Sequence, residues 1–148
     1  MANPDSVGQN TQDSFGNYRV AWAVPVSVGT VANAAAVMPI LNGGLQGTGQ
    51  VIVRRITVSN AANSAGGTVQ SCAGVTISVS TDSAGTSNIT TNAAVSNVTS
   101  NIGYQDLTLI ASTYANAITS NALFVNVTAG AVANHTVRVT VYGDVVTF

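Results

Sequence analysis

Neither lysine nor glutamate occurs anywhere in the 148 residues of this sequence, and leucine occurs only five times. These three residues are among the strongest helix formers, so long amphipathic helices have little to be built from. β-Branched residues take their place, since valine, isoleucine and threonine together fill 49 of the 148 positions. Their side chains are stiff at the first torsion angle and pack well on a pleated surface. The sequence therefore predicts an all-β protein.

Apolar and polar residues alternate along several short segments, as they do in half-buried strands. The predicted strands are 18–28, 50–60, 75–80, 106–110, 123–127 and 137–142. In the first of them, one face carries Tyr18, Val20, Trp22, Val24, Val26 and Val28. In the last, Arg138, Thr140 and Tyr142 are expected to face outward. Segment 89–99 is a weaker strand, and segment 34–41 is either a short helix or an irregular strand.

These segments amount to seven or eight strands separated by turns rich in glycine, serine and asparagine. The favoured architecture is an antiparallel two-sheet sandwich with a jelly-roll arrangement, and an immunoglobulin-like sandwich is the alternative. We assign residues 1–17 to a polar N-terminal arm and residues 18–148 to a single sandwich domain. Gly143 and Asp144 are expected to form a turn before a final apolar tail, 145–148.

Charged residues make up only 6% of the chain, with four arginines, five aspartates and a formal net charge of -1. Binding to nucleic acid or to an anionic membrane needs many basic residues on one face, so we expect neither partner. Segment 20–50 is uncharged but is interrupted by Pro25 and Pro39, which argues against a membrane span. The N-terminus lacks a basic region followed by an apolar one, so we expect no secretory signal peptide.

The chain has one histidine, His135, and one cysteine, Cys72, and its five aspartates are scattered singly. A zinc site needs three or four histidine or cysteine ligands, and glycosidase chemistry needs paired carboxylates. No nucleophile motif accompanies His135. We therefore expect a protein that is not an enzyme and that has no catalytic residue, no metal site and no cofactor.

Arg54 and Arg55 are adjacent on a predicted strand and so should point to opposite faces. One of them would then share a face with Ile52, Ile56 and Val58, where a charge is costly unless it is paired. Its partner is either an aspartate of the same subunit or one from a neighbouring subunit, and the sequence leaves both open.

The lack of lysine and glutamate also bears on function. Both side chains lose much rotamer freedom when they are held still, and interfaces are depleted in both. A chain without them suits a protein that is packed against copies of itself or against a large partner. The candidate contact residues are Asp5, Asp13 and Phe15 in the polar arm, Val146 and Phe148 in the apolar tail, and the pair Arg54 and Arg55.

Segment 51–144 includes the stretches VRRITVSN, GVTISVSTDSAGT, LFVNVTAG and TVRVTVYGD. In the general character of these stretches, the segment resembles small jelly-roll proteins of tailed bacteriophage particles, especially capsid decoration (cement) proteins. Phage tail and fibre domains share this general sequence character.

The resemblance implies a homotrimer or similar cluster on the outside of the virion, made in the host cytoplasm, which bridges subunits of the major capsid protein lattice. It brings no catalytic residue. A phage tail or fibre component and a carbohydrate- or receptor-binding module are the alternatives. A module of the second kind would need exposed aromatic residues, for which Tyr104, Tyr114 and Tyr142 are the candidates.

Overall fold

A computed structural model describes residues 9–12, 18–39, 50–63, 68–100, 102–115, 117–118, 120 and 122–146. Within these residues the chain forms nine β-strands and one short helix. The elements are β1 (Gln9–Gln12), β2 (Tyr18–Ser27), β3 (Ala32–Pro39), β4 (Gln50–Asn63), β5 (Thr76–Ser80), β6 (Ala93–Ala94), β7 (Tyr104–Asp106), α1 (Ala111–Ala115), β8 (Ala122–Ala129) and β9 (His135–Val146). The first of these strands lies within the polar arm.

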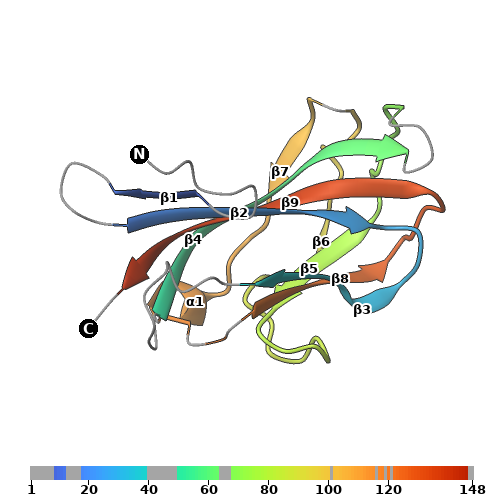
Figure 1. The fold of residues 1–148 in the computed structure, drawn as a ribbon. Coiled ribbons are helices and arrows are strands. Elements are labelled where there is room, and N and C mark those ends of the chain that lie inside the picture. Colours follow the sequence, from blue (N-terminus) through green and yellow to red (C-terminus); the bar gives the residue numbers. More distant parts are fainter. Residues whose placement is uncertain are drawn as a thin grey trace.

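The strands form two antiparallel sheets, one above the other in Figure 1. The larger sheet has the order β1-β2-β9-β4-β7, and the smaller sheet has the order β3-β8-β5-β6. The predicted antiparallel two-sheet sandwich is therefore confirmed.

The pairing between strands is nested along the chain. β2 pairs with β9, β3 with β8, β4 with β7 and β5 with β6. The eight strands from β2 to β9 thus follow one long hairpin folded over into two four-stranded sheets, which is the jelly-roll arrangement. β1 extends the larger sheet beyond β2.

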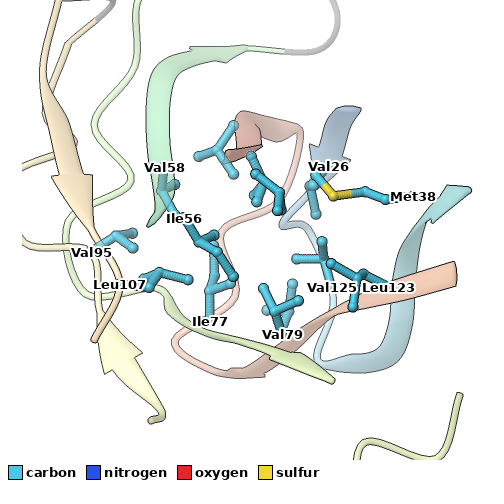
Figure 2. Packing of buried hydrophobic residues seen from close by; sticks show 14 of the residues in the cluster. Val26, Met38, Ile56, Val58, Ile77, Val79, Val95, Leu107, Leu123 and Val125 are labelled. Atoms are coloured by element: carbon cyan, nitrogen blue, oxygen red, sulfur yellow. The ribbon is translucent and has the colours of Figure 1, made fainter. Parts of the chain in front are cut away.

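Aliphatic side chains fill the space between the sheets. Figure 2 shows Ile56 and Val58 of β4 directed toward Ile77 and Val79 of β5. The alternation in the sequence predicted the buried face of four strands correctly, because all of the following are buried: Val26, Val28, Ile77, Val79, Leu123, Val125, Val127, Val137, Val139 and Val141. Trp22 pairs in register with the buried Val141.

β4 does not keep a regular alternation. Val51 and Val53 are buried, and so are Ile56 and Val58, so the two runs are out of phase by one residue. In the pairing with β9, Val53 is opposite Gly143 and Arg55 is opposite Tyr142. Arg54 is therefore the additional residue of a β-bulge, in which two residues oppose one on the partner strand.

The bulge explains why the turn predicted at Gly143 and Asp144 is wrong. β9 continues through both residues to Val146. A Cβ atom at position 143 would lie 2.6 Å from the backbone oxygen of Ile52. Glycine is needed here because β4 approaches the β9 backbone closely at the bulge, and this use of glycine has the same sequence signature as a turn.

The structure also bears on three other predicted segments. The described residues of segment 34–41, 34–39, belong to β3, so the irregular strand is the alternative that holds there. β3 is irregular because Ala34 has a φ of 51° and donates its N–H to Asn126 Oδ1 at 2.8 Å. Segment 89–99 contributes only the two residues of β6. The strand predicted at 106–110 is β7, which ends at Asp106 and is followed by the buried Leu107.

Deleting Arg54 should leave the fold intact, because the bulge would close and the inward positions from Val51 to Val58 would alternate regularly. Deleting Thr57 instead makes Ile56 and Val58 adjacent, so they point to opposite faces and at least one of them leaves the core. Exposing one such side chain costs roughly 1.5–3 kcal/mol, a large part of a typical folding free energy. Urea unfolding should therefore give a stable protein for the first deletion and a strongly destabilised one for the second. Equal losses would contradict this assignment of the bulge.

Candidate interaction surface

The β4 bulge places Arg54 and Arg55 on the same side of the sheet. Both side chains are exposed. Arg54 contacts Asp144 and Arg55 contacts Tyr142, and these two partners lie two residues apart on one face of β9. The expectation that the arginines point to opposite faces is therefore wrong, since it assumed a regular strand. Neither charge enters the core.

Arg54 is held by a carboxylate of its own chain. Its Nε donates to Asp144 Oδ2 at 2.7 Å, and the two side chains are 58% and 27% exposed. Of the two partners that the sequence left open, the structure shows the one within the subunit. At this exposure such a pair contributes at most about 1 kcal/mol to folding.

Arg55 is held mainly by an aromatic ring. Its guanidinium carbon lies 4.4 Å from the centroid of the Tyr142 ring, a cation–π distance. Its Nε is 4.0 Å from Asp106 Oδ1, which also accepts a hydrogen bond from Thr57 Oγ1. The guanidinium therefore covers one face of Tyr142.

A fifth charged residue, Arg138, lies on the same side of β9, where it is exposed between the buried Val137 and Val139. We call the outer side of β4, β7 and β9 that carries Arg54, Arg55, Asp106, Arg138 and Asp144 the charged face. Three arginines against two aspartates give it a net charge of +1, whereas the whole chain has -1. Among the charged side chains that the structure describes, only Asp82 lies elsewhere.

Asp82 organises a loop after β5. Its carboxylate accepts N–H hydrogen bonds from Ala84 at 2.9 Å, from Thr86 at 3.2 Å and from Ser87. These backbone donors, with Ser87 first and Thr86 second, lower the pKa of Asp82 from 3.8 to about 2. The loop is thus built around a carboxylate that stays ionised.

This loop lies on the outer side of the smaller sheet. Asn33 of β3 donates through Nδ2 to Ala84 O at 2.8 Å. A Cβ at Gly85 would lie 3.4 Å from Cγ of Asn126, whose side chain is buried and donates to Ser80 Oγ at 2.9 Å. The smaller sheet is therefore covered here by its own loop, whereas exposed side chains line the charged face.

The remaining candidate contact residues are placed only in part. Asp5, Asp13, Phe15 and Phe148 lie outside the described residues. Val146 is the last residue of β9 and pairs with Gln50, but its side chain is not described. The structure therefore brings together only Arg54 and Arg55 of the predicted set.

Asp106 and Asp144 were missed by the sequence analysis. Asp144, the partner of Arg54, was predicted to lie in a turn. Asp106 was predicted to begin a strand, whereas in the structure it is the last residue of β7. Outward positions for Arg138 and Tyr142 were correctly predicted from the alternation of β9. One feature of the sequence could have revealed Asp106 and Asp144. The apolar residues of β4 are spaced by two up to Val53 and again from Ile56, but Val53 and Ile56 are three residues apart, which indicates a bulge.

His135 is partly exposed, whereas Cys72 is buried, with its Sγ 3.9 Å from the backbone oxygen of Thr136. Nδ1 of His135 lies 2.7 Å from the backbone oxygen of Ala133. Cys72 is buried in the core, and burial raises the pKa of its thiol. Within the described ranges, no three histidine, cysteine or acidic side chains form a cluster that could hold a metal ion. No helix among these residues is long and apolar enough to cross a membrane.

No protein-family model matches the chain, and searches of curated proteins and of solved structures found no match either.

The Asp82 loop should be sensitive to acid. A carboxyl whose pKa is lowered on folding stabilises the native state above its ordinary value of 3.8, and this contribution is lost as the pH falls toward about 2. Asp82→Asn has a single acceptor oxygen, so it cannot accept the N–H groups at both the former Oδ1 and the former Oδ2. Urea midpoints should show the variant less stable than the unsubstituted protein at neutral pH, with the gap closing near pH 2.

The matched control is Ser83→Ala in the same loop, because the Ser83 side chain is exposed and makes no hydrogen bond among the described residues. Its effect on the midpoint should not vary with pH. A gap for Asp82→Asn that is the same at both pH values would contradict the proposed role of the carboxylate.

Proposed function

We propose that this protein is a non-enzymatic structural component of a virion, which decorates the outside of a tailed-phage capsid and stabilises it by bridging major capsid subunits. The observation that supports this proposal most directly is the charged face. It is the exposed side of the larger sheet, and it carries five of the six charged side chains that the structure describes.

The composition of this face is that of a protein interface. Interfaces are enriched in arginine and tyrosine and depleted in lysine and glutamate, and energetically dominant contacts are enriched in arginine and tyrosine as well. The charged face has three arginines together with Tyr104 and Tyr142, and the chain has no lysine or glutamate. Its ion pairs fix the arginine side chains beforehand, which lowers the entropy lost on binding.

A polyanion is a poor partner for the same face. Asp106 and Asp144 lie among the arginines, so the net charge is only +1. Nucleic acid is bound through many basic contacts to successive phosphates. A protein surface that has both charged and apolar groups fits this pattern better.

A glycan is the second candidate ligand, because the side chain of Tyr104 is 65% exposed. Sugar rings stack on open aromatic faces. The other aromatic side chain described on this face, Tyr142, is covered by the Arg55 guanidinium. Tyr104 alone offers little stacking area, so we favour the protein partner.

The proposed mechanism is linkage between binding and assembly. A ligand that binds the assembled lattice and not the free subunits stabilises the lattice by RT ln(1 + [L]/Kd). If the protein is a homotrimer, as the resemblance implies, each trimer makes several contacts at once, and modest single contacts then give a long-lived complex.

Cosedimentation tests the proposal. The purified protein should pellet with assembled shells of the major capsid protein of its own phage, in a saturable ratio, and should not associate with the unassembled capsid protein. Shells that carry it should disassemble at a higher temperature. The absence of the protein from purified virions, together with no pelleting on shells, would contradict the proposal. Binding to a glycan array without pelleting would support the second candidate instead.

A further inference from the structure

One row of side chains crosses the larger sheet at the edge of the charged face. Ser59 of β4 pairs with Arg138 of β9 on one side and with Tyr104 of β7 on the other. Arg138 also pairs with Pro25 of β2. Directly paired residues of antiparallel strands present their side chains on the same face, so these four residues form a single row across four strands. We call it the Arg138 row.

The Arg138 row is open to solvent. Pro25, Arg138 and Tyr104 are exposed, and the small Ser59 lies between the two long side chains. Neighbouring strands are about 4.8 Å apart, so the backbones of Arg138 and Tyr104 are separated by about 10 Å. A single peptide segment can therefore reach both side chains.

Arg138 differs from the other two arginines of the charged face. Arg54 is paired with Asp144, and Arg55 lies on Tyr142 beside Asp106. For Arg138, the described residues include no ion pair, hydrogen bond or ring contact. Its five N–H donors, arranged to fit a carboxylate in a bidentate manner, are all available.

Exposed apolar surface lies close in the chain to the Tyr104 end of the Arg138 row. Ile102, two residues before Tyr104, is 86% exposed and is the most exposed large apolar side chain among those described. An unpaired arginine and an exposed tyrosine are of the residue types that dominate binding energy near the centre of protein interfaces, where such groups become desolvated.

We infer that the Arg138 row is the anchor of the charged face and binds a segment of the partner protein that presents an aspartate or glutamate next to an apolar side chain. The carboxylate pairs with the Arg138 guanidinium, and the apolar side chain packs on Tyr104 and Ile102. The inference rests on the proposed function, since the partner is the capsid protein.

The test uses two variants with the same change in net charge. Arg138→Gln removes the proposed anchor, and Asn92→Asp adds a negative charge at an exposed position directly before β6 of the smaller sheet. Both are exposed substitutions, and thermal unfolding should show that both fold. Each is then titrated onto assembled shells of the major capsid protein, beside the unsubstituted protein and Arg138→Lys.

Arg138→Gln is expected to weaken binding at least about tenfold, because it leaves a partner carboxylate buried without a cation. Asn92→Asp should bind within about twofold of the unsubstituted protein, and Arg138→Lys should recover part of the loss, since lysine keeps the charge but not the bidentate geometry. If the unsubstituted protein binds and Arg138→Gln binds equally well, the inference is wrong while the proposed function stands. If the unsubstituted protein does not bind the shells, both are wrong.

Discussion

The structure depends on one constraint, which is that the charged side chains of β4 must lie outside the core. A chain with so few charged residues has two adjacent arginines in the middle of its longest strand, and a regular strand would direct one of them into the core. An unpaired charge there would cost several kcal/mol. The bulge at Arg54 avoids this cost, because one additional residue lets both arginines face solvent while Val53 and Ile56 stay buried. Both arginines of β4 lie on the charged face because of that single residue.

Much of the fold can be predicted from the residue types and from the period at which apolar residues recur along the chain. The absence of lysine and glutamate and the abundance of valine indicated an all-β chain, and strict alternation identified the buried faces of β5, β8 and β9. What the pattern could not supply is the pairing between distant segments. Gly143 was interpreted as a turn residue because glycine has the same signature in a turn and at a close approach of two strands. Only the register between β4 and β9 distinguishes the two uses.

The candidate surface was predictable only in part, for a related reason. Arg54 and Arg55 were singled out because a regular strand would place one of them on an apolar face, where its charge needs a partner. Arg138 was correctly expected to face outward. Their partners come from β7 and β9, which are far away in the sequence, so no local pattern could connect them. The sequence also contained no indication that the smaller sheet is covered while the larger one is exposed. The Asp82 loop covers the smaller sheet near Asn126 through contacts between side chains and backbone, which no sequence pattern reveals.

Electron cryomicroscopy of shells that carry the protein tests the central claim most directly, because it shows which side of the sandwich is covered. The account predicts that the larger sheet is against the shell, with Arg138 and Tyr104 within contact distance of a carboxylate and an apolar side chain of the capsid protein. A map in which the charged face points to solvent, while the smaller sheet or the Asp82 loop contacts the shell, would contradict it.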